Sequence, residues 1–117
     1  MTPYLLVGAG GVLGALSRFA VGAWLPGRRR DTLAVNVLGS FALGALTVGL
    51  ADGSALLTAL GTGFCGAFTT FSSFAVETVE LHEDGATRVA VGNAAVHLVG
   101  ALLAVALGGW TATAVAG

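Results

Sequence analysis

The stretch VAVGNAAVHLVGALLAVALGGW, from Val89 to Trp110, contains no aspartate, glutamate, lysine or arginine in its 22 residues. A helix needs about 20 consecutive apolar residues to cross the hydrocarbon core of a bilayer. An uncharged run of this length is too long for an ordinary buried helix of a small soluble domain. The stretch therefore predicts a membrane-spanning helix.

Three further apolar runs of similar length precede it, at about residues 4–25, 32–50 and 56–81. The chain of 117 residues is 56 % hydrophobic and 9 % charged, whereas soluble domains are about 25 % charged. With residues 89–110, these runs predict an all-α membrane protein, a single four-span domain over residues 1–117.

The same composition excludes several classes of protein. Almost nothing is left outside the four spans for a separate catalytic domain. Cys65 is the only cysteine, which excludes a disulfide framework. Five arginines and no lysine give no basic surface for nucleic acid. We find neither a nucleophile-and-base arrangement nor metal-ligand spacing, so we predict that the protein is not an enzyme.

Small residues recur at helical spacing within the predicted spans. Such spacing lets membrane helices approach closely and predicts a tight helical assembly. A simpler explanation, that glycine is common in membrane helices, also accounts for part of the pattern. The residues concerned are Gly10 with Gly14, Ser40 with Gly44, and Gly100 with Ala104 and Gly108.

The third run is irregular, because Gly61, Gly63 and Gly66 precede the sequence FTTFSSF at 68–74. Each glycine weakens a helix by about 1 kcal/mol relative to alanine. We expect the third helix to be broken, with the backbone opening near Gly66 and resuming after Thr69. Freed carbonyls at membrane depth need protein, water or an ion as partners, and carbonyls that point inward would form a cation site.

Polar side chains at membrane depth are costly and mark candidate functional positions. Asn36 offers two donors and an acceptor, either for an interhelical hydrogen bond or for the lining of an anion path. Arg18 is expected to extend toward the interface, and Glu77 to be a solvated carboxylate near the exit from the span. His97 is more often neutral and hydrogen-bonded across helices than a carrier of protons.

Phe68, Phe71, Phe74 and Glu77 follow one another at a spacing of three residues, which places them along one helical face. The edge of a phenylalanine ring is electropositive. Ring edges could attract an anion without the tight binding of a lysine or arginine, and conduction requires an ion that can leave. The usual explanation of such a stripe is packing, and only its combination with the glycines and Asn36 favours an anion path.

Three segments resemble the Fluc/CrcB family of small fluoride channels: GAGGVLGALSR (Gly8 to Arg18), DTLAVNVLGSFALG (Asp31 to Gly44) and GFCGAFTTFSSFAVE (Gly63 to Glu77). The resemblance implies a passive exporter of fluoride, built as an antiparallel dimer with two pores and a central structural sodium ion. It places Asn36, Phe71 and Phe74 in the pore.

By the same resemblance, the main-chain carbonyls of Gly66 and Thr69 hold the sodium ion. Thr70 and Ser72 are candidate polar lining, and Glu77 matches the glutamate that ends the family motif. His97 is a departure, since a neutral polar residue is expected at its position.

The arginines predict an orientation. Arg28, Arg29, Arg30 and Arg88 fall in loops on one side of the membrane, and none falls on the side of the termini. Since the positive side is cytoplasmic, the termini are expected outside the inner (plasma) membrane. A dimer partner would be an antiparallel copy or a second, oppositely oriented family member.

Two other functions remain open on the sequence. A small proton-coupled exporter of organic cations can share this size and number of spans, but it requires an embedded carboxylate. Spans one, two and four contain none, and Glu77 near the exit of the third span is a poor substitute. A membrane scaffold without transport would leave Asn36 and the phenylalanine motif unexplained.

Overall fold

The computed structural model describes residues 2–25 and 27–116, without the side chains of Thr2 and Arg28. The secondary structure in these ranges is entirely helical: α1 (Thr2–Trp24), α2 (Arg28–Gly49), α3 (Ala55–Leu57), the π-helix η1 (Thr58–Cys65), α4 (Gly66–Phe68), α5 (Phe71–Glu83) and α6 (Thr87–Ala116). Four segments are long and apolar enough to cross a membrane: Pro3–Trp24, Arg29–Gly49, Ala55–Glu83 and Thr87–Ala116. The prediction of an all-α, four-span protein is confirmed.

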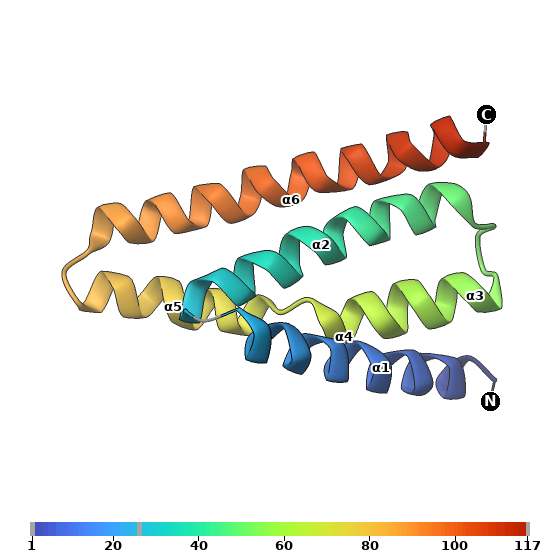
Figure 1. Cartoon of the computed structure of the whole chain (residues 1–117), viewed down its shortest axis with the longest axis horizontal. Coiled ribbons are helices and arrows are strands. Elements are labelled where there is room, and N and C mark those ends of the chain that lie inside the picture. Colours follow the sequence, from blue (N-terminus) through green and yellow to red (C-terminus); the bar gives the residue numbers. More distant parts are fainter. Residues whose placement is uncertain (1, 26, 117) are drawn as a thin grey trace.

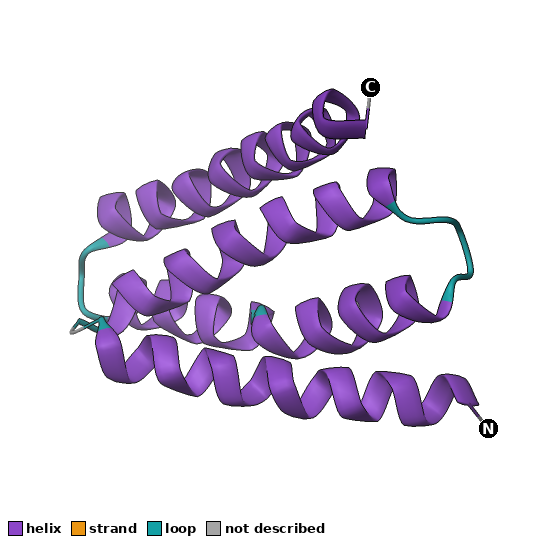
Figure 2. Ribbon diagram, turned by 45° about the vertical axis from the view of Figure 1, so that its right-hand side comes forward, coloured by secondary structure: helices purple, strands orange, loops and turns teal. Residues whose placement is uncertain are grey.

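The four spans form an elongated bundle with extents of 46 × 31 × 23 Å. Both ends of the chain and the link from α2 to α3 lie at one end of the bundle, and the links from α1 to α2 and from α5 to α6 lie at the other (Figures 1 and 2). Arg29, Arg30 and Arg88 therefore share one end. The side chain of Arg28 lies outside the described part of the structure.

Two pairs of spans pack with their backbones in close approach. α1 packs on η1, and α2 packs on α6. A Cβ atom added at any of four glycines would collide with a carbonyl group of the neighbouring span: Gly10 with Ala59, Gly14 with Phe64, Gly44 with Val105, and Gly108 with Phe41. At these four positions, the small residues predicted to allow close approach of the helices do lie in close backbone contact. Gly100 instead meets only the side chain of Val37.

Large apolar side chains remain exposed along the outside of the bundle, among them Phe19 at 76 % and Leu102 at 62 %. A protein in water rarely exposes contiguous apolar surface on this scale. The exterior is therefore suited to lipid.

The third span is assembled from four helical pieces. η1 contains Gly61 and Gly63 and gives way to the short α4. Thr69 and Thr70 are extended, with φ/ψ of −83°/161° and −149°/115°, and α5 begins at Phe71 (the teal link within the third span in Figure 2). The expectation that the backbone opens near Gly66 is wrong, because Gly66 has helical angles (−60°, −39°).

Candidate functional site

The extended pair Thr69–Thr70 is held by its own side chains. The Thr69 hydroxyl donates to the carbonyl of Cys65 at 2.9 Å, which ties the end of α4 to the preceding turn. The Thr70 hydroxyl accepts the backbone N–H of Ser73 at 3.2 Å and so caps the start of α5. Threonine is a favoured helix cap because its oxygen satisfies one of the unpaired N–H groups. These threonines fix where the helix stops and where it resumes.

Asn36 of α2 bridges the main chain of Thr70. Its Oδ1 accepts the Thr70 N–H at 2.8 Å, and its Nδ2 donates to the Thr70 carbonyl at 3.0 Å. Both main-chain groups belong to the extended pair, where helical partners are missing. An unpaired backbone group away from water raises the free energy of the folded chain. Because the Asn36 carboxamide pairs with both the N–H and the carbonyl of Thr70, it stabilises the extended backbone at this residue.

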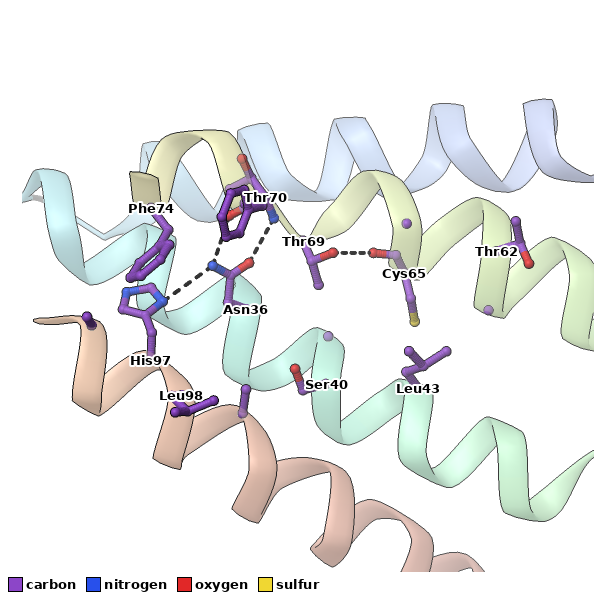
Figure 3. Close-up of a pocket in the computed structure, with 16 residues that line it drawn as sticks. Asn36, Ser40, Leu43, Thr62, Cys65, Thr69, Thr70, Phe74, His97 and Leu98 are labelled. Carbon is purple, nitrogen blue, oxygen red and sulfur yellow. Dashed lines mark hydrogen bonds between the residues drawn. The ribbon is translucent and has the colours of Figure 1, made fainter. Parts of the chain in front are cut away.

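The rings of Phe74 and His97 lie beside this carboxamide (Figure 3). The ring centroids of Phe74 and His97 are 4.6 Å apart, and those of Phe71 and Phe74 are 5.7 Å apart. His97 is buried, and its Nδ1 lies 3.5 Å from the Nδ2 of Asn36, a long contact that joins α6 to α2. His97 is therefore part of the site. This contact agrees with the expectation that His97 forms a hydrogen bond to a neighbouring helix.

A cavity of about 690 Å³ lies between α2, the third span and α6. It brings together six of the eight residues predicted for the pore and the sodium site: Asn36, Gly66, Thr69, Thr70, Phe71 and Phe74. In Figure 3 the side chains of Asn36, Thr69, Thr70 and Phe74 lie together around the hydrogen bonds of Asn36. The lining combines one carboxamide, threonine hydroxyls and aromatic rings in otherwise apolar surroundings, a pattern typical of binding sites for small ligands.

The other two predicted residues do not line this cavity. Ser72 is exposed, and its Oγ lies 3.4 Å from the Thr70 hydroxyl. Glu77 is only 6 % exposed, so the interpretation as a solvated carboxylate is wrong. Its Oε1 has no hydrogen-bond partner within the described residues.

The predicted stripe of Phe68, Phe71, Phe74 and Glu77 does not form a single face. Phe68 is buried and stacks on Phe64 at a centroid distance of 5.5 Å, whereas Phe71 is 78 % exposed. The spacing of three residues assumed one continuous helix. The extended residues between α4 and α5 separate Phe68 from the residues that follow.

Ser40 and Thr62 also line the cavity, although neither was predicted as a site residue. Ser40 follows Asn36 by four positions and hence shares its helical face, so this signal was available in the sequence. Thr62 lies in η1, whose widened turns change which residues face inward, and its position could not be read from a regular period.

A second cavity, of about 500 Å³, lies on the arginine-bearing half of the molecule. Its polar lining comprises Arg18, Asp31, Thr32, Thr70 and Ser73. Thr70 thus lines both cavities. The sequence singled out Arg18 but gave no reason to place it in the same cavity as Asp31, because that depends on how α1 meets α2.

The comparisons with known proteins establish the family of the chain. The sequence profile of the family described as "CrcB-like protein, Camphor Resistance (CrcB)" matches residues 5–109. The chain belongs to the CrcB family. Its matched segment includes every residue of the two cavities.

Relatives of the CrcB family carry a specific functional name. A protein of Natronomonas pharaonis named "Fluoride-specific ion channel FluC 2" is 56 % identical over 104 residues, which cover 89 % of each chain. A protein of Halobacterium salinarum named "Fluoride-specific ion channel FluC 1" is 50 % identical, covering 90 % of this chain and 89 % of the other. A FluC 2 protein of Listeria innocua is 43 % identical, covering 90 % and 86 %.

Proposed function

We propose that this CrcB-family chain forms a passive, fluoride-selective channel in the inner membrane that exports fluoride from the cytoplasm. The observation that carries the proposal is the convergence of Asn36, Phe71 and Phe74 on one cavity beside an interrupted helix. Relatives named as fluoride-specific channels, at up to 56 % identity over most of the chain, support the same conclusion.

The chemistry of the cavity suits a small, strongly hydrated anion. Fluoride must exchange water for several oriented donors, and the Asn36 amide, the Thr70 hydroxyl and the ring edges of this cavity are donors of this kind. The Ser72 hydroxyl, which lies outside the cavity lining but 3.4 Å from the Thr70 hydroxyl, is proposed as a further donor of the pore. None of them carries a full positive charge. Binding therefore stays weak enough for the ion to leave, as conduction requires.

The two cavities offer a route past Thr70. One lies around Asn36 and the rings, and the other holds Arg18 and Asp31 nearer to the arginine-bearing end. An anion that enters from that end would meet Arg18 and then the Thr70 hydroxyl. We propose Glu77 of α5, which lines neither cavity but is buried with Oε1 unpartnered among the described residues, as a further polar group of the pore wall.

Export needs no chemical energy source in this proposal. A membrane potential of 100 mV, negative inside, contributes about 2.3 kcal/mol per elementary charge. That potential drives an anion outward through any selective open path. Fluoride that enters a cell as the neutral acid and dissociates would leave in this way, which lowers its toxicity.

We further propose that a structural sodium ion is held by the main-chain carbonyls of Gly66 and Thr69. The residues fit such an ion. The Thr70 N–H, which a continuous helix would direct to the Gly66 carbonyl, goes to Asn36, and the Ser73 N–H goes to the Thr70 hydroxyl instead of the Thr69 carbonyl. Carbonyl oxygens at an unwound helix suit a hard cation, which would fix the two halves of the span.

We propose that the pore is completed by an antiparallel partner. Phe71 lines the cavity and is yet 78 % exposed in the single chain, so a second chain is needed to enclose it. With the arginines at one end only, we expect the termini outside and the partner to be either a copy of this chain or an oppositely oriented second family member.

One observation favours the alternative of a proton-coupled exporter. Glu77 is a buried carboxylate with an unpaired oxygen within the described part of the chain, and such a group is able to carry a proton. An exporter of this kind would move its substrate faster when a pH gradient is imposed. A passive channel would respond only to the fluoride gradient and the membrane voltage.

The test is ion efflux from liposomes that contain the purified chain, alone and co-expressed with a candidate partner. We expect rapid loss of fluoride, retention of chloride, and no requirement for a pH gradient. Equal leakage of both halides would refute the selectivity. Flux that depends on a pH gradient and vanishes in Glu77→Gln would support the exporter. Full activity of the chain alone would exclude an obligate second family member.

A further inference from the structure

A second kind of site lies where α2 and α6 begin, away from both cavities of the proposed pore. Farther along, these helices meet backbone to backbone at Gly44 and Gly108. Near their first turns a groove of about 400 Å³ separates them. Its polar lining is Arg29, Arg30 and Asn93, and its apolar lining is Leu33, Val89 and Val96.

No side chain of the described residues fills the space beside Gly92 in this groove. Gly92 lies in its wall, and a Cβ atom added there would meet nothing within 4 Å. Val89 and Val96 are 48 % and 52 % exposed. An apolar ligand would therefore find room and contact surface.

The mouth of the groove is cationic. Arg29 and Arg30 are both exposed, and none of the described lining residues is acidic. Asp31 follows them in the chain but faces the other way, since it lines the second cavity and lies close to Gly22 of α1. Its carboxylate therefore does not neutralise the groove.

The depth of the groove fits the edge of a bilayer. Arg29 is the first residue of the second candidate span, and Thr87 is the first of the fourth. From Val89 to Val96 a helix rises about 10 Å, at 1.5 Å per residue. The arginines therefore stand at the level of lipid headgroups, and the apolar wall continues about two turns into the hydrocarbon.

From this arrangement we infer that the groove binds an anionic phospholipid. The phosphate lies between Arg29 and Arg30, and the first part of an acyl chain lies along Leu33, Val89 and Val96. Asn93, which donates to the Thr78 hydroxyl at 3.0 Å, holds α6 to α5 behind the groove. A basic pocket between membrane helices at the positively charged side recognises anionic headgroups in this way. The inference does not depend on which ion the protein conducts.

The test is native mass spectrometry of the intact assembly, released from nanodiscs that contain phosphatidylglycerol and phosphatidylcholine in equal amounts. We expect preferential retention of phosphatidylglycerol. Each arginine near an anionic headgroup contributes a factor of about 5 to binding. The preference should thus fall about fivefold in Arg29→Gln or Arg30→Gln and about 30-fold in the double variant.

Matched variants distinguish lipid binding in the groove from a general effect of charge or of side-chain size elsewhere on the protein. Arg88→Gln removes the same charge at the same end but outside the groove lining, and should retain the preference. Gly92→Leu fills the groove and should abolish it, whereas Gly8→Leu, at another open glycine, should not. If Gly92→Leu fails to assemble, the arginine variants decide.

Several results would overturn the inference. An unchanged preference in the double arginine variant would do so, as would an equal loss in Arg88→Gln. Displacement of the lipid by inorganic phosphate at an equal concentration would assign the site to a free anion. Dissociation of the assembly in Gly92→Leu with lipid retained would assign the groove to a second copy of the chain.

Discussion

The two halves of α2 meet their neighbours in opposite ways. Around Gly44 the helix lies directly against the backbone of α6, with main-chain atoms of Val105 nearest to it. Around Asn36 it is separated from α5 by a cavity and reaches across through a carboxamide. The C-terminal half, around Gly44, holds the bundle together by packing. The N-terminal half, around Asn36, presents polar groups to a cavity, where we propose that an ion exchanges its water for them. One helix thus supplies both the scaffold and the site.

The largest expected effect comes from disturbing the packed half. In Gly108→Leu the new side chain would collide with the carbonyl of Phe41. Overpacking against a backbone that cannot move should cost about 3 kcal/mol or more. We expect loss of the monodisperse assembly in size-exclusion chromatography. Gly8→Leu, in open space, serves as the control, and a stable Gly108→Leu assembly would contradict the close packing.

Changing the ring of Phe71 should affect stability less than Gly108→Leu does, and should act mainly on fluoride flux. Phe71→Ile removes an aromatic edge from the cavity, and an edge contact contributes up to about 1.5 kcal/mol. Fluoride efflux should therefore fall about tenfold, while the assembly elutes normally. Phe41→Ile, at a partly exposed ring of α2 that lines neither cavity, is the matched control. Efflux that falls equally in both variants would show that Phe71 acts through membrane anchoring and not through the pore.

The smallest effect is expected at Thr69, where the side chain and the carbonyl have separate roles. Thr69→Val removes the hydroxyl that donates to Cys65 but retains the carbonyl proposed to hold sodium. Loss of one hydrogen bond should lower the free energy of unfolding by about 1 kcal/mol. A thermal melt in detergent measures this change, with Thr113→Val, an exposed threonine bonded to its own helix, as the control. A large loss of fluoride flux in Thr69→Val would place the hydroxyl itself in the path.

Most of the fold could be predicted because lipid imposes simple rules on sequence. The predicted spans agree with the candidate spans to within a few residues at most ends. The largest difference is at the C-terminal end of α6, which continues from Trp110 to Ala116. Hydropathy marks where apolar residues stop, but small residues and threonine can continue a helix beyond that point.

The details of the site were less accessible. The hydrogen bonds between Asn36 and Thr70 join residues 34 positions apart, and no local sequence pattern predicts them. The extended residues are Thr69 and Thr70 and not the region of Gly66, because helix propensity is a weak guide once side chains cap the backbone. The burial of Glu77 likewise depends on the packing of α5, which a position near the end of a span does not reveal.

The most direct test of the central claim is fluoride efflux from liposomes that contain Asn36→Asp. The substitution retains the size of the side chain but replaces the donor at Nδ2 with a carboxylate oxygen that faces the Thr70 carbonyl and any passing anion. We predict that the variant assembles like the wild type, as judged by its elution volume, and that its fluoride efflux falls to the level of empty vesicles. Efflux at the wild-type rate from a correctly assembled variant would contradict the account.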